Sequence, residues 1–417
     1  MNEDVPHDTG ALRSVAGLAG AIVSAAIPPF LVGALAPRIA LSIPLDTGDV
    51  GIAMAGFYLV SGVLSPAGGR VVHRLGPTAA LRWACGLSTL GLAAISAASN
   101  PVQMIVLLTL LGVPNAVVQP SCNEVLSRLR SSQVRAVSFG AVQSSIPVAT
   151  LIAGVLLAVA SYGIGWRWTV LGVAVLTVAA QLPIPNLAPN TGAVSAVQPP
   201  PRRRSTSAAR GPARGLLGLL VATGFLASCA VTSLPSFAAT TGHHFGLAPW
   251  VIAAAQMLGS VGSAVMRVVA PALTSRASAR RQLMAVALLQ GTGTLGFVAL
   301  ATGSSAGFVA GTIAAFTFGW GFNGLFNLIV TDAHPGRIAT ATGLTQGGVF
   351  IGGMAGPLVF AAIAGSERFG AAWLAMALFM CGALSATLLA ARRARSVTTA
   401  HTVVPAGPVT VPEGNRW

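Results

Sequence analysis

The hydrophobic residues of this chain fall into long runs that short polar or proline-containing segments separate. Each run holds roughly 20 residues, the length of an α-helix that crosses the hydrocarbon core of a bilayer. The runs lie near residues 14–36, 50–69, 79–98, 101–121, 139–160, 166–184, 215–238, 250–270, 283–302, 306–330, 339–364 and 370–391. The pattern therefore predicts an all-α membrane protein with twelve transmembrane helices.

The sixth and seventh runs are separated by an unusually long polar segment. Residues 185–214 are rich in Pro, Ser and Thr and carry five arginines, a composition that favours a flexible basic linker over a packed element. The linker divides the helices into two bundles of six. The expected organisation is a tail at 1–12, a first bundle at 13–184, the linker at 185–214, a second bundle at 215–395 and a disordered tail at 396–417.

Composition places most of the protein surface in lipid. Hydrophobic residues make up 54% of the 417 residues and charged residues only 8%, whereas soluble proteins carry about 25% charged residues. All 24 basic residues are arginines, and they give a net charge of +15. A nucleic-acid-binding protein would need a basic, water-exposed domain, but these arginines form short tracts between apolar runs. We therefore expect a lipid bilayer, and no nucleic acid, as the partner.

The arginines also predict the orientation in the membrane. Twenty of them lie on the side that holds both termini and the linker, and three lie on the other side. Cytoplasmic loops carry such an excess of basic residues. We therefore expect a multi-pass protein of the cell (inner) membrane with both termini in the cytoplasm.

Two segments of the chain share a weak internal repeat. In each, polar residues recur every fourth position, so on a helix they form one stripe. The stripe residues are Asn115, Gln119 and Asn123 in the first segment and Asn323, Asn327 and Thr331 in the second. A carboxylate follows the first asparagine by nine residues in both segments, as Glu124 and Asp332. Such a repeat inside hydrophobic sequence is typical of transporters built from two related halves, so we expect the two bundles to be pseudo-symmetric.

Six amide side chains are the candidate contacts for a transported solute. They are Asn115, Gln119, Gln143, Asn323, Asn327 and Gln346. Counted from the nearest arginine at a helix end, Gln143 and Gln346 lie roughly 12–14 Å into the membrane at about 1.5 Å per residue. Polar side chains at this depth usually face the bundle interior, and amides can replace the hydration of a polar or anionic solute. A single amide more often holds helices together, so we expect at least two of the six to contact the cargo.

Two carboxylates near cytoplasmic helix ends are candidate gate residues. Glu124 lies about 180° around the helix from Asn115 and does not share the amide stripe. We expect salt bridges that break once per transport cycle, and the pairs are Glu124 with Arg70, Arg74 or Arg135, and Asp332 with Arg337 or Arg276. The alternative is a solvated charge at a helix end, worth about 0–1 kcal/mol.

Arg267 is the one basic residue inside a predicted span. Because it lies near the cytoplasmic end of its helix, we expect its side chain to snorkel to the cytoplasm, with binding of an anion as the alternative. No Asp or Glu lies deep in a span, which leaves coupling to protons open, because proton relays usually need an intramembrane carboxylate or histidine. The same absence weighs against cationic cargo, because an unpaired cation in the membrane interior is costly.

Other function classes lack the residues that they require. The four cysteines lie far apart and His243-His244 are direct neighbours, so neither set has the spacing of a metal site. The chain has no lysine and therefore no Gly-x4-Gly-Lys loop for the phosphates of ATP. An enzyme would also need a nucleophile and a base, or a metal cluster, at membrane depth. We therefore expect no metal, no cofactor and no enzymatic activity.

The arrangement of six spans, a basic linker and six related spans resembles the major facilitator superfamily. The motif of this family between the second and third helices is Gly, three residues, Asp, a basic residue, any residue, Gly and two basic residues. Residues 69–78, GRVVHRLGPT, keep both glycines and the first basic residue, but histidine replaces the aspartate and Pro-Thr replaces the last basic pair. In the family the aspartate helps to latch the cytoplasmic side. The resemblance therefore implies that Glu124 or Asp332 provides the latch here.

The resemblance implies a secondary active or facilitative transporter that works by alternating access, and we expect a monomer. The amides favour a small polar or anionic organic solute as cargo, and a coupling ion such as H+ is left open. The alternative is a drug efflux antiporter. Residues 352–357, GGMAGP, resemble the glycine-rich pattern of such antiporters, although they lie in the other half of the chain.

Overall fold

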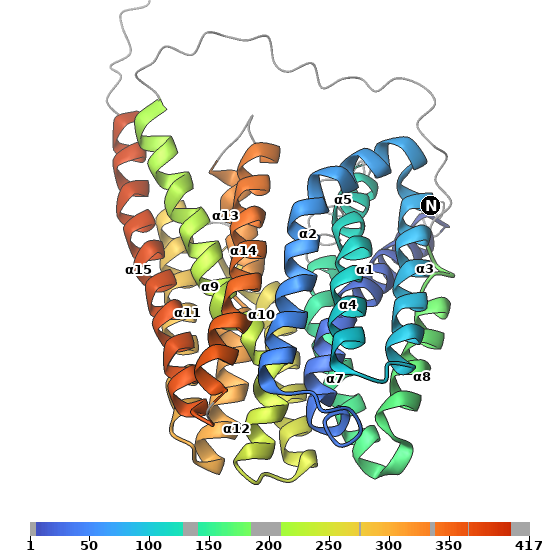
Figure 1. The fold of residues 1–417 in the computed structure, drawn as a ribbon. Helices are drawn as coiled ribbons and strands as arrows, with labels where there is room; N and C mark the ends of the chain where they lie inside the picture. The colour runs from blue at the N-terminus through green and yellow to red at the C-terminus, as the bar shows by residue number, and fades with distance from the viewer. Residues whose placement is uncertain are drawn as a thin grey trace, which may run out of the picture.

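The structure is a computed structural model that describes residues 6–127, 141–184, 210–274, 277–333, 338–365 and 367–401. All regular structure in these residues is helical (Figure 1). A helix satisfies every backbone N–H and C=O group within its own segment, which is the requirement that lipid imposes on a chain that crosses a membrane.

The helices before residue 185 follow the predicted spans closely. They are α1 (Pro6–Ile39), α2 (Thr47–Leu75), α3 (Pro77–Ser96), α4 (Pro101–Leu110), α5 (Gly112–Ser127), α7 (Ser145–Val159), the π-helix η1 (Ala160–Ile164) and α8 (Trp166–Ala179). Local sequence sets several of their starts. The side chain of Asp46 accepts a hydrogen bond from the backbone N–H of Asp49 at 2.7 Å and caps α2. Asn100 caps α4 in the same way, and Pro101 follows it.

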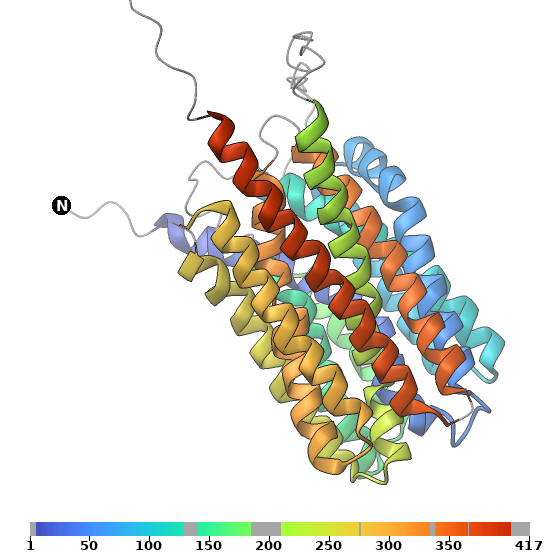
Figure 2. The same ribbon diagram turned by 90° about the vertical axis from the view of Figure 1, so that its left-hand side faces the viewer.

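The second half repeats this series of long helices. They are α9 (Arg210–His244), α10 (Pro249–Thr274), α11 (Ala279–Ala301), α12 (Ser305–Ala314), the π-helix η3 (Ala315–Trp320), α13 (Asn323–Asp332), α14 (Ile338–Ala364) and α15 (Phe369–His401). Figure 2 shows α9 and α15 side by side along most of their length.

When consecutive helices such as α4 with α5, α7 with η1, and α12 with η3 and α13 are each counted as one span, the described residues form eleven helices that are long and apolar enough to cross a membrane. The predicted span at 166–184 differs, because α8 has 14 helical residues and ends in a turn. Three predicted boundaries also move. The helix α1 begins at Pro6, inside the expected tail, and α15 continues past residue 395 to His401. The helix α9 begins at Arg210, inside the expected linker, whose residues 185–209 lie outside the described residues.

The helices α1 to α8 lie together on one side of the molecule, and α9 to α15 lie on the other (Figure 1). Three pairs of helices make most of the contact between the two groups, and these are α1 with α9, α2 with α14, and α7 with α10. We call the end that carries Arg70, Arg74, Arg82, Arg281 and Arg392 the basic end, and the opposite end, where α1 and α9 finish, the loop end.

Close approach of glycine backbones joins the two groups at the loop end. A Cβ atom on Gly51 of α2 would lie 2.5 Å from the Cβ of Ala361 of α14, and one on Gly62 would lie 3.0 Å from the Cβ of Phe350. Towards the basic end, Gly69 of α2 and Gly343 of α14 face open space. The two helices therefore touch at the loop end and diverge towards the basic end.

The pair α7 and α10 is joined by polar contacts instead. The amide of Gln256 donates to the backbone carbonyl of Thr150 at 3.1 Å. The hydroxyls of Thr150 and Ser260 lie 2.8 Å apart. Both contacts are buried, so each satisfies polar groups that would otherwise be unpaired in a low-dielectric interior.

The start of α8 fastens the loop end of the first group. The indole N–H of Trp166 donates to the hydroxyl of Ser42, after α1, at 2.8 Å. The next residue, Arg167, donates to the backbone carbonyls of Ser96 at 2.9 Å and Ala98 at 2.6 Å, at the end of α3. Its guanidinium also lies 4.4 Å from the ring centroid of Trp166. These contacts tie the loop ends of three helices together.

We predict that Gly33→Ala lowers the thermal midpoint of the protein in detergent, whereas Gly86→Ala leaves it unchanged or raises it. A Cβ on Gly33 would lie 2.5 Å from the backbone oxygen of Pro235 on α9, and one on Gly86 of α3 would meet nothing within 4 Å. Overpacking costs about 1–3 kcal/mol, and alanine at an open helix position gains roughly 0.5–1 kcal/mol over glycine. Thermal unfolding followed by tryptophan fluorescence tests this. Equal midpoints for the two variants would show that α1 and α9 do not pack this closely.

Candidate functional site

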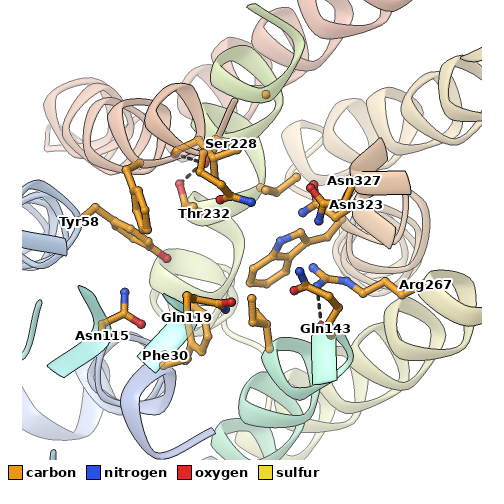
Figure 3. A pocket seen from close by; sticks show the side chains of 18 of the residues that line it. Phe30, Tyr58, Asn115, Gln119, Gln143, Ser228, Thr232, Arg267, Asn323 and Asn327 are labelled. Carbon is orange, nitrogen blue, oxygen red and sulfur yellow. Dashed lines mark hydrogen bonds between the residues drawn. The ribbon is translucent and has the colours of Figure 1, made fainter. Parts of the chain in front are cut away.

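A cavity lies between the two groups of helices, and all six amides predicted from the sequence line it. Counting its open mouth, the cavity holds about 940 Å³ of space that no atom fills. Residues from both groups line it, as Figure 3 shows for Asn115, Gln119 and Gln143 of the first and Asn323 and Asn327 of the second. The sixth amide, Gln346, is on α14.

In the first group, the three amides lie close to interruptions in the helices, two of them after one interruption and the third before another. The chain turns at Leu111 between α4 and α5, and Asn115 and Gln119 follow in the first turns of α5. The side-chain N–H of Asn115 donates to the hydroxyl of Ser61 at 3.0 Å, and that hydroxyl donates to the backbone oxygen of Phe57 at 2.7 Å. Asn115 therefore joins α5 to α2 and also lines the cavity. Gln143 ends a short helical stretch just before α7.

In the second group, amides also follow an interruption of a helix. The π-helix η3 and a turn at Gly321 and Phe322 interrupt the helix before α13, which begins at Asn323. π-Helical segments and broken membrane helices are frequently found at functional sites. Asn327 lies one turn further along α13, and Gln346 is exposed on the part of α14 that lies towards the basic end.

The structure corrects the expectation that Arg267 snorkels to the membrane surface. Its side chain is only 2% exposed and lines the cavity. Its Nη1 donates to the backbone carbonyl of Gln143 at 2.9 Å, which joins α10 to the first group of helices. The backbone of α10 can sit here because a Cβ on Gly324 of α13 would lie 3.0 Å from the Arg267 Cα. In Figure 3 the guanidinium points from α10 towards Gln143.

Aromatic side chains form the apolar part of the cavity lining. Phe30 of α1 and Trp320 of η3 pack edge to face across the two groups, with ring centroids 5.7 Å apart. Phe30 and Trp320 are each 4% exposed. Tyr58 of α2 lines another side, and its ring lies beside Gly353 of α14. Sequence reasoning missed these residues, because an aromatic residue within an apolar run carries no signal that separates a cavity wall from a packed core.

The cavity opens towards the basic end. Gln346 is exposed to solvent there, and α2 and α14 have diverged by Gly69 and Gly343. At the other end the packed rings of Phe30 and Trp320 and the close glycine contacts obstruct the path. In the part of the chain that the structure describes, this cavity therefore has its mouth at the basic end.

The predicted gate residues that the structure describes lie at the basic end and do not line the cavity. Arg70 and Arg74 are exposed at the end of α2, and Asp332 is exposed at the end of α13. Glu124 is half-buried on α5. Arg135, Arg276 and Arg337 lie outside the described residues, so the structure does not test the pairs that include them.

The chemistry of the lining is that of a binding site for a solute. Among the described lining residues, amides and hydroxyls supply donors and acceptors, aromatic rings supply apolar surface, and no carboxylate is present. No group of three His, Cys, Asp or Glu side chains in the described part of the chain is placed to hold a metal ion. A polar cavity between two groups of membrane helices, open at one end, is the architecture of a membrane transporter.

Comparison with known proteins agrees with this class. The sequence profile of the Major Facilitator Superfamily matches residues 10–357, so the chain belongs to this superfamily. A comparison with curated proteins finds no match. Among solved structures, the chain is similar to a point mutant of the nucleoside transporter NupG, with a TM-score of 0.67, 12% identity, and coverage of 91% of this chain and 98% of that one.

A second solved structure has the same fold. It is a bacterial homologue of the human lysosomal transporter Spinster in an inward-facing, unoccupied conformation. It is similar with a TM-score of 0.64 and 13% identity, over 94% of this chain and 99% of that one. Identities this low establish the shared fold and leave the cargo open.

We predict that a cysteine at Gln346 reacts with a water-soluble maleimide in protein reconstituted into nanodiscs, because this position is exposed at the open mouth. The variant Gln346→Cys is made with Cys381→Ala, since Cys381 is the exposed native cysteine in the described residues. Ser233→Cys in the same background is the control and should stay unlabelled, because Ser233 is 0% exposed. Equal labelling at the two positions would contradict a cavity with this mouth.

Proposed function

We propose that this protein carries a small polar or anionic organic solute across the cytoplasmic membrane by alternating access, either as a secondary active transporter or as a facilitator. Its helices would form two pseudo-symmetric bundles of six, with both termini in the cytoplasm. The observation that carries the proposal is a single cavity to which the two halves contribute amides from equivalent positions.

The equivalence of the amides supports a shared route for the solute. Asn115 and Asn323 each follow an interruption of their helix, and Gln143 and Gln346 lie on the helices that come next. A membrane interior is a costly place for a polar side chain. Six amides in one cavity are therefore best explained by a ligand that uses their donors and acceptors, in addition to helix contacts such as that of Asn115 with Ser61.

The basic end is the cytoplasmic end in this proposal, because of its excess of arginines. The observed state would then be open to the cytoplasm. Glu124 and Asp332 would pair with arginines of the same end when that mouth closes, Glu124 with Arg70, Arg74 or Arg135, and Asp332 with Arg276 or Arg337. Such pairs must break in each cycle, which suits exposed salt bridges of modest strength.

The structure weakens the reason for the alternative function, drug efflux by antiport. The glycine before Pro357 has a packing role, because a Cβ on Gly356 would collide with the backbone of Cys229 on α9. A cavity whose described lining lacks a carboxylate is also a poor environment for a cationic drug. The nucleoside cargo of one structural relative is not carried over, because 12% identity supports the fold alone.

We predict saturable, protein-dependent uptake of at least one solute when proteoliposomes are screened with labelled polar and anionic compounds. Asn323→Ala and Gln143→Ala should each raise its half-saturation concentration about 2- to 10-fold, because a hydrogen bond contributes roughly 0.5–1.5 kcal/mol. Gln181→Ala is the control, because Gln181, in the turn after α8, bonds to the carbonyl of Thr177 and does not line the cavity. A pH gradient across the vesicles shows whether protons are coupled.

The same screen can overturn the proposal. Wild-type transport by alanine variants of all six amides, each correctly inserted, would rule out a solute site at this level. Chemical conversion of a solute without net movement would point to an enzyme on a transporter scaffold.

A further inference from the structure

The cavity contains a cation whose charge no side chain of the structure balances. Among the described lining residues Arg267 is the only charged one. Its Nη1 is bonded to the carbonyl of Gln143, whereas its Nε and Nη2 are buried and have no hydrogen-bond partner. A buried guanidinium with two unpaired N–H groups is costly, because no described side chain offsets its desolvation.

No described carboxylate supplies the missing negative charge. The internal segments outside the described residues, 128–140, 185–209, 275–276, 334–337 and 366, contain no Asp or Glu. The described carboxylates Asp46, Asp49, Glu124, Asp332 and Glu367 do not line the cavity. The other four carboxylates, Glu3, Asp4, Asp8 and Glu413, belong to the terminal segments, whose side chains the structure does not describe. The described side chains thus leave the charge of Arg267 without a counter-ion.

The two unpaired N–H groups, on Nε and Nη2, indicate which kind of anion fits beside Arg267. Nε–H and Nη2–H lie on one edge of the planar guanidinium, parallel to each other, and this edge matches the two oxygens of a carboxylate. The third nitrogen, Nη1, is already held by Gln143, which fixes the orientation of the free edge. One such edge with no second cation in the described lining suits one carboxylate and a net charge of −1.

The residues around Arg267 indicate the chemistry of the rest of the bound anion. The Trp320 ring centroid lies 5.8 Å from the Arg267 Cζ, and Phe30 packs against the same indole. These rings offer flat apolar surface directly beside the charge. The amides of Asn323 and Asn327 lie on the same side of the cavity (Figure 3) and can bind further polar groups.

We propose that Arg267 is the binding site for the carboxylate of an organic monoanion, whose flat apolar body lies against Trp320, and that this monoanion is the cargo. The inference rests on the proposed transport function and narrows it from polar or anionic solutes to monocarboxylates. Because Nε and Nη2 are buried although Arg267 lines the cavity, the carboxylate reaches them only when a neighbouring side chain moves aside.

Paired probes test the site without knowledge of the natural cargo. The purified full-length protein is titrated with benzoate, nicotinate and cinnamate, each against its uncharged amide, and binding is followed by thermal stabilisation and tryptophan fluorescence. At least one carboxylate should bind about tenfold or more tightly than its amide, because charge-assisted bidentate hydrogen bonds are the strong ones. Phthalate should bind more weakly than benzoate, because no second cation faces it.

Variants then assign the effect to the guanidinium. Arg267→Gln should abolish the preference for the carboxylate over its amide, and Arg267→Lys should retain only part of it, because an ammonium lacks the bidentate edge. The matched control is Arg281→Gln at the exposed start of α11, which should bind as the wild type does. Thermal midpoints without ligand show that each variant is folded.

The outcomes separate this site from the transport function. Carboxylate binding that depends on Arg267, with no solute moving into proteoliposomes, would support the anion site and overturn the transport proposal. Saturable transport of an uncharged solute, unchanged in Arg267→Gln and with no carboxylate preferred over its amide, would overturn the anion site and leave transport standing. A carboxylate preference that survives Arg267→Gln would also overturn the assignment.

Discussion

The structure follows from one constraint, which is that lipid cannot satisfy a polar group. The backbone meets this constraint by forming helices, and the polar side chains that line the cavity meet it by turning away from lipid. Six amides and one arginine from helices far apart in the sequence consequently gather in one cavity. The hydrogen bond from Arg267 to the carbonyl of Gln143 shows the result most clearly, because it joins the two groups of helices at membrane depth.

The two groups are joined unequally along their length, and this inequality is what gives the cavity a mouth. Glycines at positions 33 and 51 let backbones of opposite groups nearly touch at the loop end, while Gly69 and Gly343 face open space at the basic end. Contacts made of small residues can open without leaving large apolar side chains unpacked, which suits helices that separate and rejoin. The helix α10 is bonded to Thr150 of α7 and to Gln143 just before α7, so this pair is placed to act as the axis of such a movement.

Sequence periodicity predicted much of this site but not its charge. The four-residue spacing of Asn115 and Gln119, repeated by Asn323 and Asn327, was sufficient to place amides on one face, and the structure brings them into one cavity. Arg267 could not be placed in this way, because its depth fits both a snorkelling side chain and a buried one. What decides between them is the packing of α10 against Gly324, a contact between distant segments. The aromatic lining and the short α8 were hidden for the same reason, since apolar runs do not reveal their neighbours.

The central claim is that this cavity opens alternately to the two sides of the membrane, and distances between spin labels in nanodiscs test it most directly. One labelled pair, Gly69→Cys with Gly343→Cys, reports on the basic end, where both positions face open space. The other pair, Leu41→Cys with His243→Cys, reports on the loop end, where both side chains are exposed. The account predicts two populations in which a short distance at one end accompanies a long distance at the other, with their ratio changed by a bound carboxylate. A single fixed distance for both pairs, with and without ligand, would contradict it.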